Sequence, residues 1–271
     1  MNIGVFGRDK DKLIPISSIG DTIGLTVLIK EIYNLTGFKS SIATLLPEVF
    51  ENNPYVEKVY MGTSAENPLL PCTQYSCNII QNYFNQFSFP LPENFTPEIY
   101  LSNKEIKYAQ EELKEFKGKK KIAVCLNSSA DSRDLRYDKI LPLLEKLRSQ
   151  GYILIGVGLG NQSEEIYHKS FINKTRLRQV FSIINECDFY LGVDTGLLHA
   201  AAALNKPQFV FFRHNGCSNN AYSNTYYLDS PLTCPNQCHE AGVVKCFSEV
   251  RCMDMFNFEQ YYKMIINKFP I

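Results

Sequence analysis

This chain has no excess of charge of either sign, because its 271 residues include 28 basic and 28 acidic side chains. That balance excludes the strongly basic surface typical of nucleic-acid or anionic-lipid binding. No apolar run approaches the roughly 18 residues of a membrane span. Residues 1–10 carry too short an apolar stretch for a signal peptide, and charge follows it rather than precedes it. These absences predict a cytoplasmic protein with no nucleic-acid partner and at most peripheral membrane contact.

What is present is enough apolar material for a full core, since 45% of the residues are hydrophobic. Strand-like and helix-like segments alternate along the chain, which predicts parallel βαβ units with right-handed crossovers. The alternation pauses at the lysine-rich residues 117–121 and then starts again. We therefore expect two α/β units, over 1–118 and 119–271, with the small-molecule site in a cleft between them.

The most informative segment is residues 188–204, an apolar strand followed by an Asp-Thr-Gly corner and an alanine-rich helix. A helix that begins at such a corner leaves its first backbone N–H groups without intrahelical partners. Those groups favour an anion, most often a phosphate, at the carboxyl end of the strand. The pattern predicts a phosphate-bearing substrate or cofactor within reach of Asp194 and His199. The structural alternatives are a helix N-cap for Asp194 and core packing for His199.

Two further motifs are ambiguous from the residues alone. Gly156-x-Gly158-x-Gly160 matches the dinucleotide fingerprint only in part, and it does not open a first strand–turn–helix unit, so hydride transfer is not favoured. Asp21 follows an expected strand at residues 13–17 and stands at the start of a helix. It is either the N-cap of that helix or a carboxylate that acts on a substrate.

Nine cysteines are many for a chain in a reducing compartment. Four of them cluster near the C-terminus, at Cys234, Cys238, Cys246 and Cys252. Clustered thiols in such a compartment indicate a metal rather than disulfides, and this set suits tetrahedral zinc or iron, with His239 as a spare ligand. The spacing is wider than in the C-x2-C pairs of zinc ribbons, so free thiols are the alternative.

Four segments in this order carry a family pattern. They are residues 17–26 (Ser-Ser-Ile-Gly-Asp-Thr-Ile-Gly-Leu-Thr), residues 53–59, the basic–aromatic element Leu135-Arg136-Tyr137, and residues 192–204. Together they resemble the lipopolysaccharide heptosyltransferases of glycosyltransferase family 9, although Tyr137 stands where that family usually has Trp. The resemblance implies an α/β GT-B fold, with two Rossmann-like doubly wound domains facing a cleft. Residues 1–118 would then form the acceptor-side domain, and residues 119–271 the nucleotide-sugar-binding domain with the cysteine-rich segment and a closing helix.

The resemblance also implies an activity: metal-independent, inverting transfer of a sugar from a nucleotide-diphospho-sugar to a hydroxyl of a glycan acceptor. The family default donor is ADP-heptose, and the acceptor is a saccharide or lipid-linked glycan. No cofactor is required for catalysis, so zinc or iron at the cysteines would be structural. A non-catalytic module of this fold that binds nucleotide sugars or glycans is the alternative, and a sugar epimerase is a third possibility.

Residue roles follow from the same resemblance. Asp21 would be the general base that takes a proton from the acceptor hydroxyl. The implied donor-binding residues are Asp194, Thr195, Gly196, His199, Arg136, Ser128, Ser129 and Glu164, with Arg133 as the substitute for Arg136 and Glu165 as the substitute for Glu164.

Overall fold

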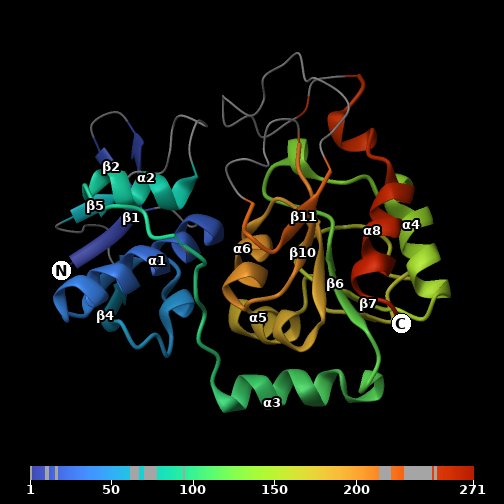
Figure 1. Ribbon diagram of the computed structural model, residues 1–271, viewed down its shortest axis with the longest axis horizontal. Coiled ribbons are helices and arrows are strands. Elements are labelled where there is room, and N and C mark those ends of the chain that lie inside the picture. Colours follow the sequence, from blue (N-terminus) through green and yellow to red (C-terminus); the bar gives the residue numbers. More distant parts are fainter. Residues whose placement is uncertain are drawn as a thin grey trace. The chain divides into compact units, whose positions relative to one another are not determined.

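The periodic apolar segments fold into two α/β units, Met1–Ser102 and Asn103–Ile271, in the computed structural model of the chain (Figure 1). The structure describes residues 2–9, 12–15, 18–61, 67–69, 78–93, 95–213, 221–228, 246 and 249–271. The boundary comes before helix α3 (Asn103–Glu112), whereas the sequence analysis placed it at residue 118. Helix α3 joins the second unit because its Glu105 pairs with the buried Arg178 of that unit.

The first unit is a five-stranded sheet with the order β2-β1-β3-β4, and β5 also pairs with β1. Its elements are β1 (Asn2–Asp9), β2 (Lys12–Pro15), α1 (Ile19–Thr36), β3 (Ser40–Thr44), β4 (Val56–Met61), β5 (Asn67–Leu69) and α2 (Ile79–Gln86). Strand β1 pairs in parallel with β3 and β5, and β3 pairs in parallel with β4. Strand β2, which precedes the first corner, is antiparallel to β1. The expected strand at 13–17 is therefore the return arm of a hairpin.

The second unit is built on a six-stranded sheet in which every pairing is parallel. Its strands are β6 (Lys121–Cys125), β7 (Ile153–Gly156), β8 (Lys169–Ser170), β9 (Phe189–Val193), β10 (Gln208–Phe211) and β11 (Thr225–Tyr227). The order β11-β10-β9-β6-β7-β8 is that of a Rossmann fold, because the chain winds outward from β6 in both directions. The renewed alternation of strands and helices expected after residues 117–121 is confirmed in this unit.

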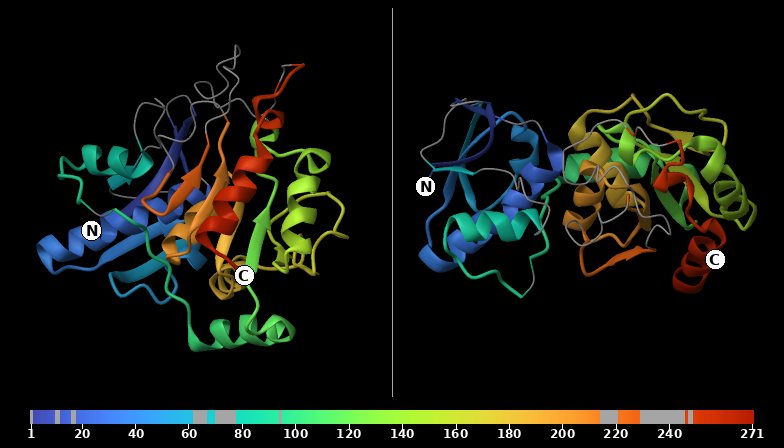
Figure 2. Two further views of the ribbon diagram at one scale, coloured as in Figure 1. Left: turned by 45° about the vertical axis from the view of Figure 1, so that its right-hand side comes forward. Right: turned by 90° about the horizontal axis from the view of Figure 1, so that it is seen from above.

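Helices cover both faces of this sheet, as a doubly wound fold requires (Figure 2). Helices α4 (Tyr137–Ser149) and α8 (Phe258–Lys268) lie on one face, and α5 (Leu177–Glu186) and α6 (Gly196–Ala203) lie on the other (Figure 1). Strands β6 and β9 are buried along their whole length, which explains why their residues are apolar except for Lys121 at the start of β6. Within the described ranges, no helix combines the length and the apolar character needed to cross a bilayer.

Candidate functional site

The candidate site lies at the carboxyl edge of the second unit's sheet, where β6 and β9 are neighbours. Strand order reverses between these two strands, and open α/β sheets bind their ligands at such a switch point. The loop after β6 carries Ser128, Ser129 and Arg133, and the corner after β9 carries Asp194 and Thr195. The parallel sheet therefore brings together residues that are about sixty positions apart in the chain.

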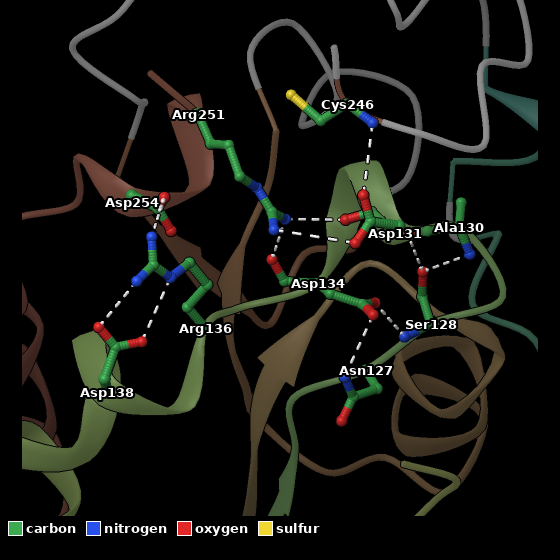
Figure 3. A network of polar contacts seen from close by, with 10 residues as sticks. All are labelled: Asn127, Ser128, Ala130, Asp131, Asp134, Arg136, Asp138, Cys246, Arg251 and Asp254. Atoms are coloured by element: carbon green, nitrogen blue, oxygen red, sulfur yellow. Dashed lines mark hydrogen bonds and ion pairs between the residues drawn. The ribbon is translucent and has the colours of Figure 1, made fainter. Parts of the chain in front are cut away.

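Side chain–backbone hydrogen bonds hold the loop after β6 in shape (Figure 3). The Asp134 carboxylate accepts a hydrogen bond from the Ser128 amide at 2.6 Å and from Asn127 Nδ2 at 3.1 Å. The Ser128 hydroxyl donates to the Ala130 carbonyl at 2.8 Å. The Ser128 hydroxyl therefore stabilises the turn in this loop, and a donor contact for it stays a prediction.

Residues of the C-terminal segment donate hydrogen bonds to this loop. Arg251 donates to the backbone carbonyls of Asp131 and Asp134 at 2.8 and 2.7 Å. The amide of Cys246 donates to the Asp131 carboxylate at 3.4 Å (Figure 3). These contacts link the loop after β6 to the region that contains the cysteine cluster.

Arg133, rather than Arg136, reaches the corner after β9. Its Nη1 lies 3.6 Å from Asp194 Oδ2, and its Nη2 donates to Ser129 Oγ at 3.4 Å. Asp194 is only 4% exposed, so this ion pair is largely screened from solvent. The buried Nε of Arg133 makes no hydrogen bond within the described structure. A buried donor without a hydrogen bond is unusual in folded proteins and calls for an explanation.

Arg136 pairs with two other carboxylates, those of Asp138 and Asp254. Its guanidinium makes two hydrogen bonds to the Asp138 carboxylate, at 3.2 and 3.1 Å, and lies 3.7 Å from Asp254 (Figure 3). Half of its side chain is exposed. The structure therefore places Arg133 next to Asp194, whereas the family resemblance favoured Arg136 for the donor site.

Helix α6 begins at this corner without a side-chain cap. Thr195 is its N-cap residue and makes no side-chain capping hydrogen bond, while Asp194 precedes the cap position. The N-cap alternative for Asp194 is therefore wrong. Gly196 opens the helix, and its missing side chain allows a ligand to come close to the backbone. An uncapped first turn offers N–H donors and the positive end of the helix dipole to an anion.

His199 lies one turn further along α6 and is buried. Its Nδ1 is 2.6 Å from the hydroxyl of Tyr222, and the two rings pack edge to face. Burial lowers the pKa of His199, while the nearby Asp194 opposes that shift. The imidazole is therefore neutral near pH 7, as in the core-packing alternative, and contact with a phosphate stays a prediction.

The glycines after β7 serve close packing. Gly158 has a positive φ of 94°, and a Cβ there would lie 2.8 Å from Cys125 Sγ. A side chain at Gly160 would collide with the amide oxygens of Asn127 and Gln162, which are themselves buried without hydrogen-bond partners among the described residues. These contacts give a structural reason for the glycine pattern that does not depend on a dinucleotide.

Glu164, beyond this loop, is exposed and pairs with Lys174 at 2.6 Å. The hydrogen bond from Lys174 lowers the pKa of the Glu164 carboxyl group. Glu165 is also exposed, and its backbone carbonyl accepts a hydrogen bond from Arg148. A ribose contact for either glutamate stays a prediction.

Asp21 belongs to the first unit, in the first turn of α1. The N-cap of that helix is Ser18, whose hydroxyl accepts a hydrogen bond from the Asp21 amide. The N-cap alternative for Asp21 is therefore wrong as well. Its side chain is half-buried, and its backbone carbonyl accepts a hydrogen bond from the hydroxyl of Tyr83. The carboxylate is thus held on an ordered helix turn without being needed to cap it.

Three polar residues at the carboxyl edge escaped the sequence analysis: Asn127, Gln162 and Arg213. Asn127 and Arg213 come two residues after the ends of β6 and β10. Polar side chains directly after buried strands are the signal that could have identified them, because those positions line the ligand edge of a parallel sheet.

The cysteine cluster is described only in part. Cys234, Cys238 and His239 lie outside the described residues, whereas Cys246 is partly exposed and Cys252 is buried. Within the described part of the chain, no group of three or more His, Cys, Asp or Glu side chains is arranged to hold a metal ion.

Comparisons of the sequence and of the structure with known proteins identify similar proteins. The sequence profile of glycosyltransferase family 9 (heptosyltransferase) matches residues 73–224, more than half of the chain. Lipopolysaccharide heptosyltransferase 1 from Campylobacter coli is 25% identical over 242 residues, covering 76% of this chain and 67% of that protein.

Solved structures share the fold. A glycosyl transferase family 9 protein from Veillonella parvula superposes with a TM-score of 0.73 at 12% identity, over 97% of this chain and 95% of that one. The dodecameric iron-containing heptosyltransferase TibC, solved in complex with ADP-D-beta-D-heptose, has a TM-score of 0.66 at 8% identity, over 100% and 79% of the two chains.

Proposed function

The chain belongs to glycosyltransferase family 9, the heptosyltransferase family, and from this premise we propose that it transfers a heptose from ADP-heptose to a hydroxyl group of a lipopolysaccharide-type glycan. The expected GT-B fold and glycosyltransferase class are thereby confirmed. The relative in complex with ADP-D-beta-D-heptose supports the donor, and the lipopolysaccharide heptosyltransferase relative supports the acceptor. An enzyme is favoured over the non-catalytic module.

The observation that carries this proposal is the Arg133–Asp194 ion pair beside the uncapped start of α6. A guanidinium can bind two phosphate oxygens through parallel N–H groups, and the helix amides add further donors. We assign the donor diphosphate to Arg133, Thr195 and Gly196. Asp194 then positions the guanidinium, because their charges attract within a largely buried pair.

Asp21 would act on the acceptor. Its carboxylate accepts the proton of the acceptor hydroxyl, and the oxygen attacks the anomeric carbon from the face opposite the diphosphate. The bond from that carbon to the diphosphate oxygen breaks, and its electron pair leaves with the phosphate. Arg133 and the first amides of α6 stabilise the charge that develops there. The product has the inverted anomeric configuration.

A transfer assay with the purified chain tests this proposal. We expect ADP release from ADP-heptose that depends on a heptose acceptor, with an inverted glycosidic linkage by NMR. Asp21→Asn should abolish most turnover, whereas Glu111→Gln, which alters an exposed carboxylate paired with Lys114, should leave it unchanged. Binding of ADP-heptose without transfer to any glycan acceptor would instead support the non-catalytic module.

We also propose that the four C-terminal cysteines hold a structural zinc or iron. Two observations support this: thiolates suit both metals, and the described Cys246 contacts the loop that carries Arg133. A metal there would brace that loop and take no part in the transfer. Metal analysis of the purified chain should find about one ion per chain. Cys246→Ser should lose it while the buried Cys187→Ser retains it, and a metal-free wild type would show that the thiols are free.

A further inference from the structure

Arg213 is a buried guanidinium for which the described part of the chain provides no acidic partner. It follows β10, is only 9% exposed, and donates from Nη1 to Ser132 Oγ at 3.0 Å. Within the described residues, no carboxylate oxygen lies within 4.0 Å of it. A buried charge without a counter-ion is strongly disfavoured, so such an arrangement calls for an explanation.

Arg178 shows how this chain normally buries a guanidinium. It is 8% exposed, almost the same as Arg213, but it makes hydrogen bonds of 2.5 and 2.8 Å to the two carboxylate oxygens of Glu105. Its charge is compensated inside the fold. Since the two arginines are equally buried, the missing partner distinguishes Arg213.

The position of Arg213 indicates what could compensate its charge. Strand β10 is the neighbour of β9, and its carboxyl end lies at the same edge of the sheet as Asp194. Ser132, which accepts the hydrogen bond from Arg213, directly precedes Arg133 in a 3-10 helix. One short helix thus contacts the ends of both strands, through Arg133 to Asp194 and through Ser132 to Arg213.

We propose that Arg213 binds the diphosphate of the nucleotide-sugar donor, together with Arg133 and the first turn of α6; this assignment rests on the proposed function. The ligand would then supply the counter-ion that the described residues do not provide. Arginine suits this task because its guanidinium stays charged and offers several donors to phosphate oxygens. Nothing in the sequence resemblance singles out this residue.

Binding of ADP, inorganic pyrophosphate and adenosine to the whole chain, measured by calorimetry, tests the assignment. Arg213→Met should weaken ADP and pyrophosphate about 10- to 100-fold, as expected for lost hydrogen bonds to a charged group, and leave adenosine unchanged. Arg213→Lys should lose less, because it retains the charge. The matched control, Arg178→Met combined with Glu105→Gln, removes an equally buried guanidinium with its partner and should keep wild-type affinities.

The melting temperature without ligand distinguishes a ligand-binding Arg213 from a purely structural one. If the fold leaves Arg213 uncompensated, Arg213→Met should melt at or above the wild-type temperature, and ADP should raise the melting temperature of the wild type more than that of the variant. A lower melting temperature together with wild-type affinity for ADP and pyrophosphate would overturn the assignment.

The outcomes separate this inference from the proposed function. Heptose transfer with wild-type kcat, KM and pyrophosphate affinity in Arg213→Met would refute the role of Arg213 and leave the function standing. Pyrophosphate binding that depends on Arg213, without transfer from ADP-heptose, would refute the proposed donor and leave the anion site standing. A wild-type chain that binds no diphosphate would refute both.

Discussion

Helices α1 and α6 both begin at an Asp-containing corner, yet they begin in different ways. Ser18 caps α1 with its hydroxyl, and Asp21 follows within the first turn. In α6 the aspartate comes before the helix, the N-cap Thr195 makes no capping bond, and Asp194 pairs with Arg133. The first corner satisfies its own backbone and presents a carboxylate. The second has no side-chain capping bond at its N-cap residue, and its carboxylate pairs with a cation.

This difference fits two tasks in one reaction. A base that takes a proton needs an accessible carboxylate on a stable support. An anion site needs unpaired donors and positive charge that the fold keeps in place. Four experiments test this difference between the two helix starts, and the first concerns the carboxylate of α1.

Asp21→Ala should lower kcat about 10²- to 10⁴-fold, because the acceptor hydroxyl loses its base. The melting temperature should change little, since Ser18 and not Asp21 caps the helix. The measurements are steady-state transfer kinetics and the dissociation constant of ADP. An equal loss of ADP affinity would place Asp21 in donor binding and contradict its assignment as the base.

Arg133→Met should weaken ADP binding and reduce the free energy of unfolding by about 1–3 kcal/mol, because the buried Asp194 carboxylate loses its ion pair with Arg133. Arg136→Met removes a half-exposed ion pair and should cost only about 0–1 kcal/mol, with a smaller effect on ADP affinity. Urea unfolding and calorimetry measure both quantities. A larger affinity loss in Arg136→Met would restore Arg136 as the diphosphate ligand.

Substitution of the two N-cap residues should affect different properties, namely stability for Ser18 and ADP affinity for Thr195. Ser18→Ala should reduce the free energy of unfolding by about 1 kcal/mol, since it removes a capping bond. Thr195→Val should cost less than that, because no capping bond exists to lose, but it should weaken ADP binding. Thermal unfolding with and without ADP gives both values. If Thr195→Val destabilises the chain as much as Ser18→Ala, Thr195 contributes to its helix start as a cap does, and the contrast between the two helix starts is wrong.

The smallest effect concerns His199. Its pKa is below its ordinary value in the folded chain because it is buried, so the unfolded chain binds more protons once the pH falls below about 6.5. Its neutral form therefore favours folding above that pH, and this contribution is lost as the pH falls through the folded pKa. His199→Gln should show a weaker fall in unfolding free energy between about pH 7.5 and about pH 5.5. An unchanged pH dependence would mean that His199 is not held neutral.

Much of the second unit was predictable because its elements are strongly patterned. Strand β9 and helix α6 lie within about one residue of their expected bounds, and Asp194 and Thr195 stand at the expected corner. The first unit was less predictable. The hairpin of β1 and β2 depends on pairing between strands, which a local apolar pattern does not reveal.

Local patterns account for the alternation of buried strands and helices and for the corner at residues 194–196, because hydrophobic periodicity and glycine act locally. Three features follow instead from the packing of the folded chain: Arg133 rather than Arg136 meets Asp194, Ser18 caps α1, and Arg213 lies at the same sheet edge with no carboxylate partner among the described residues. Those choices depend on which strand ends become neighbours in a parallel sheet. Neighbouring strands can be far apart in the chain, and no local pattern records the distance between two side chains.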